Sequence, residues 1–133
     1  MKTHLSLAAS DLERSVAFYS KLLDVQPAKT LPDYALFIAD DPGLELALEL
    51  HDDVTPTLDA HYGIYAGDSA TVERAIERLT AAGLADSIER EATCCYANQT
   101  KVWATDPDGR RWEIYTVHEE TDAREEAEPS CCS

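Results

Sequence analysis

The segment Thr3–Tyr19, THLSLAASDLERSVAFY, predicts a strand that leads directly into a helix. Apolar and polar residues alternate through residues 3–9, which is the pattern of a half-buried strand. Ser10 or Asp11 then caps a helix, because a short side-chain oxygen satisfies the free amides of the first turn. The apolar stripe of this helix has three- and four-residue steps: Leu12, Val16, Tyr19 and Leu23.

The same arrangement returns in the second half of the chain. His4 precedes Asp11 by seven residues, and His61 precedes Asp68 by seven. Each aspartate opens a helix, and in both halves two strands joined by an Asp-Pro turn follow. This internal repeat predicts an α+β fold of two βαβββ modules, at about 1–52 and 58–118, whose curved sheets form one shared metal-containing cleft.

The remaining elements follow from apolar runs and turn residues. The segment 93–99 is expected to be an irregular loop, and residues 119–133 an acidic flexible tail. In the first module we expect an edge strand within 25–31 and strands at 34–39 and 44–50. In the second we expect a strand at 59–66, a helix that ends near Gly83, and strands at 87–92, 101–105 and 112–117.

Composition narrows the functional classes. The chain has 133 residues, enough for one domain with a core, and 26 acidic against 11 basic residues give a net charge of −15. Neither a nucleic-acid binder nor an anionic membrane partner suits that charge. No apolar run is long enough for a membrane span and no secretory signal opens the chain, so we expect a cytoplasmic protein. The acidity itself indicates either an acidic partner surface or adaptation to high salt.

The four cysteines form two adjacent pairs, Cys94-Cys95 and Cys131-Cys132. Neighbouring residues are about 3.8 Å apart at Cα, which is shorter than the usual span of a disulfide. Thiolates select soft partners such as trivalent arsenic. We therefore interpret Cys94 and Cys95 as a substrate-binding pair, and the pair in the tail as accessory.

His4, His61 and Glu113 are the candidate metal ligands. The two histidines occupy matching places in the repeat, and Glu113 lies on the last strand of the second module. The matching place in the first module is Ala47, although Glu45 or Glu49 on the same strand remains an alternative fourth ligand. Two imidazoles and one carboxylate with open coordination positions suit ferrous iron that activates oxygen. His51 and His118 lie in linker-like and tail-like segments and are not expected to be ligands.

With these residues in place, the chain resembles the vicinal-oxygen-chelate superfamily, which includes glyoxalase I, extradiol dioxygenases and bleomycin or fosfomycin resistance proteins. The resemblance lies in Ser10–Tyr19, SDLERSVAFY, and in Asp106-Pro107-Asp108-Gly109 followed by Trp112-Glu113.

A narrower resemblance lies in Thr93-Cys94-Cys95-Tyr96-Ala97 followed by Lys101-Val102-Trp103. This motif is similar to that of the carbon–arsenic lyases, which are grouped with cadmium-induced proteins. The resemblance implies Fe(II) held by His4, His61 and Glu113, and the arsenic of a trivalent organoarsenical such as methylarsonous acid held by Cys94 and Cys95.

The implied activity is an Fe(II)- and O2-dependent cleavage of the carbon–arsenic bond that releases arsenite. The alternatives are a cadmium- or arsenite-binding resistance protein without catalysis, and a ring-cleaving or isomerising enzyme of the same fold. A homodimer is left open.

Overall fold

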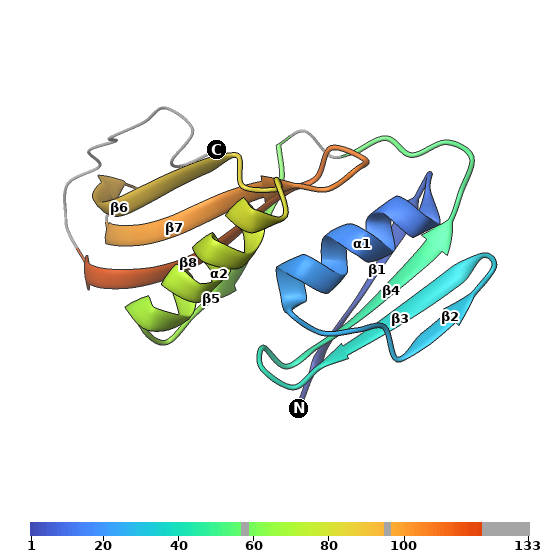
Figure 1. Ribbon diagram of the computed structural model, residues 1–133, viewed down its shortest axis with the longest axis horizontal. Coiled ribbons are helices and arrows are strands. Elements are labelled where there is room, and N and C mark those ends of the chain that lie inside the picture. Colours follow the sequence, from blue (N-terminus) through green and yellow to red (C-terminus); the bar gives the residue numbers. More distant parts are fainter. Residues whose placement is uncertain (57–58, 95–96, 121–133) are drawn as a thin grey trace. The chain divides into compact units, whose positions relative to one another are not determined.

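The computed structural model describes residues 1–56, 59–94 and 97–120 (Figure 1). It divides into two units, each with one helix and one four-stranded sheet. The first unit comprises Met1–Pro56 together with Asp106–Gly109, and the second holds the other described residues. No helix within these ranges is long and apolar enough to cross a membrane.

The first unit has the sheet order β1-β4-β3-β2, in which β1 runs parallel to β4 and the other neighbours are antiparallel. Helix α1 covers one face of this sheet (Figure 1). The elements are β1 (Thr3–Ala9), α1 (Leu12–Leu23), β2 (Lys29–Leu31), β3 (Tyr34–Ala39) and β4 (Leu44–Leu50).

Helix α1 forms as its sequence predicts. The carboxylate of Asp11 accepts a hydrogen bond from the amide of Arg14, and Asp24 ends the helix in a left-handed conformation. The large side chains of the sheet that are completely buried include Phe37, Leu46 and Leu48. The opposite face of the sheet carries the alternate residues, among them His4.

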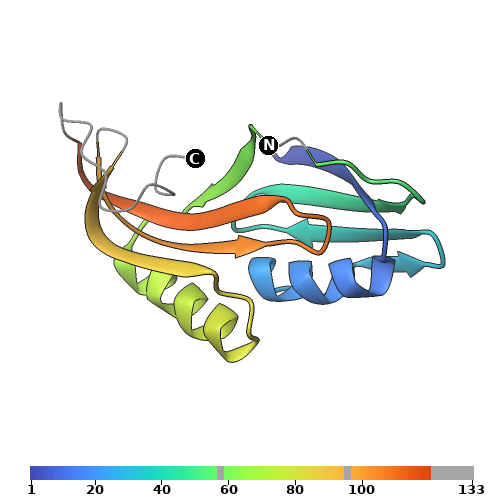
Figure 2. The same ribbon diagram turned by 90° about the horizontal axis from the view of Figure 1, so that it is seen from above.

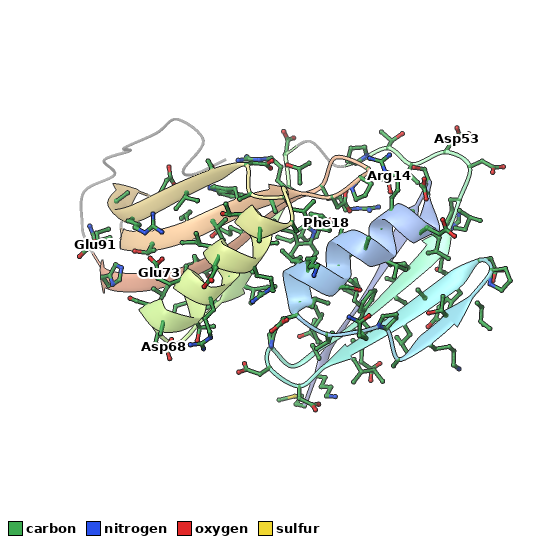
Figure 3. All side chains as sticks on the ribbon, in the orientation of Figure 1. Arg14, Phe18, Asp53, Asp68, Glu73 and Glu91 are labelled. Carbon is green, nitrogen blue, oxygen red and sulfur yellow. The ribbon has the colours of Figure 1, made fainter. Side chains whose placement is uncertain are left out.

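The second unit repeats this topology with the order β5-β8-β7-β6, and β5 runs parallel to β8. Asp68, labelled in Figure 3, caps α2 by accepting a hydrogen bond from the amide of Thr71 at 2.7 Å. Trp103 and Trp112 are both buried, as the sequence indicated. The elements are β5 (His61–Tyr65), α2 (Ser69–Ala81), β6 (Ser87–Cys94), β7 (Ala97–Thr105) and β8 (Arg111–Glu120). The expected α+β fold of two βαβββ modules is confirmed.

The turn between β7 and β8 belongs to the first unit. The hydroxyl of Tyr19 donates a buried hydrogen bond to Asp106 Oδ2 at 2.6 Å. Asp108 accepts hydrogen bonds from the amide and the hydroxyl of Ser10. A segment of four residues from late in the chain thus completes the packing of α1.

The expectation of a loop through residues 93–99 is wrong, because most of this segment belongs to strands. Strand β6 continues to Cys94 and β7 begins at Ala97, with Thr93 paired to Asn98 and Cys94 to Ala97. Polar residues occupy these strands because the neighbouring backbone satisfies them; the side-chain amide of Asn98, for example, donates to the carbonyl of Glu91 at 2.8 Å.

Two further boundaries differ from the expectation. The edge strand within 25–31 is only Lys29–Leu31, and β8 continues to Glu120, so its end lies within the expected tail. His118 is therefore a strand residue. Residues 121–133, with Cys131 and Cys132, lie outside the described residues, as do Cys95 and Tyr96.

Two β-bulges lie near the β6–β7 hairpin, where the strands of the second unit curve (Figure 2). The register between β6 and β7 shifts between Glu89 and Ala92, and Glu91 has a φ of +50°. The register between β7 and β8 shifts at His118. An extra residue in one strand increases its local twist, which accounts for the curvature.

Candidate metal and thiol site

His61 and Glu113 lie side by side on neighbouring parallel strands of the second unit. In the register of β5 and β8, Glu113 is paired with Gly63, two residues after His61. Since alternate residues of a strand share a face, both side chains extend from the same face of the sheet. His61 Nε2 lies 3.6 Å from Glu113 Oε2.

The spacing of these two atoms is close to that of two ligands of one metal ion. It is too long for a hydrogen bond. Two donors that are each about 2.1 Å from one ion lie roughly 3.0–3.4 Å apart at the angles of octahedral to tetrahedral sites, and the observed spacing is slightly longer than that range. Among the residues that the structure describes in this unit, no third His, Cys, Asp or Glu joins them in a metal-binding group.

Glu113 is a buried carboxylate. Burial raises the pKa of Glu113 above its ordinary value, and the positive charges of Lys101 and His61 oppose this increase. Lys101 Nζ lies 3.6 Å from Glu113 Oε1, and Lys101 is itself buried. The two carboxylate oxygens therefore face two different basic side chains.

Aromatic rings surround this group. The ring of His61 meets the ring of Trp103 edge-on at 5.2 Å, and the guanidinium of Arg111 lies 4.3 Å from the Trp103 centroid. Tyr115, two residues after Glu113, packs edge-on against the exposed ring of Tyr65 at 5.5 Å. Burial raises the pKa of Tyr115, and the charge of Glu113 adds to the effect.

Gly63 provides the space between these side chains. A Cβ atom at Gly63 would lie 3.1 Å from Tyr115 Cε1 and 3.3 Å from Glu113 Cγ, closer than ordinary van der Waals contact. The carboxylate and the tyrosine ring therefore occupy positions that any other residue at this place would disturb.

His4 lies in the first unit, on β1. Its side chain is 58% exposed, and its Nδ1 is 3.5 Å from Glu45 Oε1, on the neighbouring strand β4. Glu49, further along the same strand, accepts a hydrogen bond from the hydroxyl of Ser6 at 3.2 Å. The inclusion of His4 in one metal site with His61 and Glu113 stays a prediction.

The strand registers identify the counterpart of Glu113 in the first unit. His4 pairs with Glu45 as His61 pairs with Arg111, and Ser6 pairs with Ala47 as Gly63 pairs with Glu113. The match of Glu113 with Ala47, inferred from turn spacing, therefore agrees with the backbone pairing. By the same register Glu45 is the counterpart of Arg111.

Of the two cysteines, Cys94 is the last residue of β6, further along the same sheet, whereas Cys95 lies outside the described residues. Cys94 pairs with Ala97, and Glu113 pairs with Trp103, six residues further along β7. At about 3.3 Å per residue, the two positions are about 20 Å apart along the strand. Gln99 and Lys101 occupy the intervening positions in phase with Ala97 and Trp103.

Sequence reasoning missed the groups that surround Glu113. Lys101 entered the sequence analysis only as part of a motif, and the structure places its ammonium beside Glu113. Trp103 was likewise named only as part of that motif, and its ring contacts His61. Tyr115 lies two residues after Glu113, and Lys101 lies two residues before Trp103, the pairing partner of Glu113. Strand alternation alone would therefore have identified both residues as neighbours of Glu113.

A groove of about 450 Å³ in the first unit is separate from these residues. It lies between α1 and β2 and contains no histidine or cysteine among its lining residues, which are Leu12, Glu13, Val16, Thr30, Leu31 and Pro32.

Comparison with known sequences gives consistent matches. A model of the Glyoxalase/Bleomycin resistance protein/Dioxygenase superfamily matches residues 3–114. The chain is 42% identical over 131 residues to a trivalent organoarsenical cleaving enzyme of Thermomonospora curvata, covering 98% of this chain and 87% of that protein. It is 47% identical over 116 residues to the cadmium-induced protein CadI of Mycobacterium tuberculosis, covering 87% of this chain and 76% of that one.

Solved structures show the same fold. A glyoxalase/bleomycin resistance protein/dioxygenase from Alicyclobacillus acidocaldarius is similar with a TM-score of 0.72 and 21% identity, over 90% of this chain and 92% of that chain. The fosfomycin resistance protein FosX of Listeria monocytogenes gives a TM-score of 0.68 and 19% identity, over 87% of this chain and 92% of that one.

Proposed function

Because the chain belongs to the Glyoxalase/Bleomycin resistance protein/Dioxygenase superfamily, we propose that it is an enzyme that cleaves the carbon–arsenic bond of trivalent organoarsenicals. One observation carries this proposal: a candidate metal-donor pair, His61 and Glu113, lies on the same sheet as the hairpin that carries Cys94. The similarity to the organoarsenical cleaving enzymes supports it.

In this proposal His61 and Glu113 hold a ferrous ion, and His4 from the first unit completes the set of ligands. Two imidazoles and one carboxylate leave coordination positions open, and bound Fe(II) supplies the activation of molecular oxygen there. The buried surroundings of Glu113 keep water from competing with that carboxylate for its partners.

Cys94 and Cys95 capture the arsenic atom. Thiolates are the preferred protein ligands of soft, thiophilic elements, and two adjacent thiols offer two such bonds. In this proposal the two thiolates hold the carbon–arsenic bond close to the iron, a proximity effect that can contribute several kcal/mol. The backbone of Cys94 is about 20 Å from the position of Glu113 along β7, so cleavage requires that the captured arsenic be brought closer to the metal. Gln99, Lys101 and Tyr115 lie between the two positions.

The overall reaction balances without a further reductant. One molecule of methylarsonous acid and one of oxygen contain together the atoms of one arsenous acid and one formaldehyde. The carbon is oxidised, oxygen is reduced, and arsenic stays trivalent. Release of inorganic arsenite and of an oxidised carbon fragment is therefore the expected product pattern.

A second candidate function is a binder that sequesters cadmium or arsenite through the same thiols. The similarity to the cadmium-induced protein CadI favours this alternative. A binder of this kind would take up soft ions stoichiometrically, would consume no oxygen, and would be indifferent to the substitution His61→Ala.

The experiment compares wild-type protein with the Cys95→Ser and Cys132→Ser variants after anaerobic loading with Fe(II). Methylarsonous acid and air are then added, and both arsenite release and oxygen consumption are followed. We expect Cys95→Ser to keep its iron but to lose turnover, because one arsenic–sulfur bond is missing. Cys132→Ser removes a thiol of the tail and serves as the control.

The outcomes separate the candidates. Turnover at the wild-type rate in Cys95→Ser would remove the thiol pair from the mechanism. Stoichiometric binding of arsenite by wild-type protein, without oxygen consumption, would replace the lyase by the sequestering protein.

A further inference from the structure

Lys101 is a buried lysine in a position where burial is costly. Only 2% of the residue is exposed, whereas lysine is almost never fully buried unless it is paired. Removal of an ammonium group from water costs several kcal/mol, which only close partners offset. The fold therefore keeps this ammonium group beside Glu113 despite the unfavourable free energy of its desolvation.

The two oxygens of Glu113 are divided between two partners. Lys101 Nζ lies 3.6 Å from Oε1, and His61 Nε2 lies 3.6 Å from Oε2. The aromatic rings of Trp103 and Tyr115 lie 5.5 and 5.7 Å from the same ammonium group. Cation–π contacts of this length hold the ammonium in place.

We propose that Lys101 is a positioning residue that holds Oε1 of Glu113, so that the carboxylate offers only Oε2, on the side of His61, to a metal ion. This inference rests on the proposed function, because it assigns how that site binds Fe(II). A carboxylate can bind a metal through one oxygen or through both. Binding through Oε2 alone leaves one more coordination position open for oxygen or substrate.

By the same geometry, Lys101 and the metal ion would each compensate the buried charge of Glu113, one at each carboxylate oxygen. In the metal-free protein the ammonium compensates the carboxylate, and loss of one partner leaves a buried charge unpaired. A variant without this ammonium should therefore depend more strongly on bound metal for its stability. Because the positive charge of Lys101 also repels a divalent cation, its removal should not weaken metal binding.

The experiment uses the Lys101→Met variant, which keeps the length of the side chain, and Lys29→Met, which removes one exposed lysine on β2. Each protein is loaded anaerobically with Fe(II) and titrated with nitric oxide, a probe that binds at open positions of ferrous iron. The electron paramagnetic resonance signal of the nitrosyl complex is the readout, and thermal unfolding is measured with and without metal.

We expect Lys101→Met to bind one Fe(II) at least as tightly as wild type and to bind nitric oxide about tenfold more weakly, the lower end of the effects seen for residues that orient metal ligands. Its melting temperature should increase more on addition of metal than that of wild type. Lys29→Met should match wild type in both measurements.

Nitric oxide affinity at the wild-type level in Lys101→Met would overturn the inference. If Lys101→Met does not fold, Lys101→Leu, which likewise lacks an N–H donor, undergoes the same titration with the same expectation. Wild-type protein that bound no Fe(II) would overturn the proposed function together with this inference. Wild-type binding without a difference between the variants would overturn the role of Lys101 alone.

Discussion

Gly63 is the residue at which a single methyl group should disturb the candidate metal site. Its Cα lies opposite Glu113 in the parallel pair of β5 and β8, and an added Cβ would meet Tyr115 Cε1 at 3.1 Å and Glu113 Cγ at 3.3 Å. Both neighbours are packed on their far sides, Glu113 by Lys101 and Tyr115 by Tyr65. Neither can yield without a change in the geometry around the carboxylate.

We therefore expect Gly63→Ala to fold and to lose affinity for Fe(II) by about 10–100-fold, as is usual when the support of a metal ligand is changed. Isothermal titration with Co(II) or Fe(II) under anaerobic conditions measures this. Gly67→Ala is the matched control, because a Cβ at Gly67 would meet nothing within 4 Å. Equal affinities in the two variants would show that Gly63 has no such role.

At the scale of the elements, the bulge in β6 determines which backbone position of β7 lies opposite Cys94. Beyond the extra residue, each position of β6 pairs one residue further along β7 than the register of Glu89 with Lys101 would give. Cys94 therefore pairs with Ala97, which is in phase with Lys101 and Trp103. A shift of one residue exchanges the two faces of a strand. The bulge therefore determines which residues of β6 near the hairpin share a sheet face with Glu113.

Thr100 holds both bulges together. Its hydroxyl oxygen accepts from the amide of Glu91 at 3.1 Å and lies 2.7 Å from His118 Nε2. Figure 3 labels Glu91 at this end of the second unit. Substitution with valine keeps the shape of the side chain and removes the hydroxyl group.

We expect Thr100→Val to lower the free energy of unfolding by about 1–3 kcal/mol, because a partly buried amide and an imidazole lose their partner. Urea unfolding followed by circular dichroism measures the change. Thr80→Val, on the exposed side of α2, supplies the control. A loss no larger than that of the control would mean that the bulges do not depend on this hydroxyl.

Much of this fold could be predicted from local sequence. The strands at 3–9, 34–39 and 44–50 have the predicted bounds, because alternation identifies them and strong turn residues end them. The segment 93–99 was mispredicted because its polar residues are satisfied by a neighbouring strand, as Asn98 is by the carbonyl of Glu91. Such pairing depends on register, which short-range pattern does not reveal.

At the scale of the whole molecule, a net charge of −15 on 133 residues is the dominant electrostatic feature. Repulsion between like surface charges destabilises a compact state. The distance over which such charges interact falls from about 10 Å at 0.1 M salt to about 3 Å at 1 M. Screening should therefore favour the folded protein.

We expect the melting temperature to increase steadily as sodium chloride is raised from about 0.1 to 1 M. Chloride is used rather than sulfate, because sulfate also strengthens apolar burial. Differential scanning calorimetry at constant pH gives the measurement. A melting temperature that fell with salt would exclude a surface adapted to high ionic strength.

Only part of the candidate site could be predicted from the sequence. His61 and Glu113 were found because the repeat and the turn spacing place them on neighbouring strands, and the register agrees. The buried ammonium of Lys101 was not identified as their neighbour, since charge alone does not show which lysine a sheet will bury.

The turn Asp106–Gly109 has a consequence for the order in which a newly made chain can fold. Asp106 and Asp108 bind Tyr19 and Ser10, yet ribosomes synthesise them about fifty residues after the first sheet is complete. Domains usually fold from the N-terminus during synthesis. Here the first unit gains its contacts at Ser10 and Tyr19 only after residue 109 has left the ribosome, so its packing is completed late in synthesis.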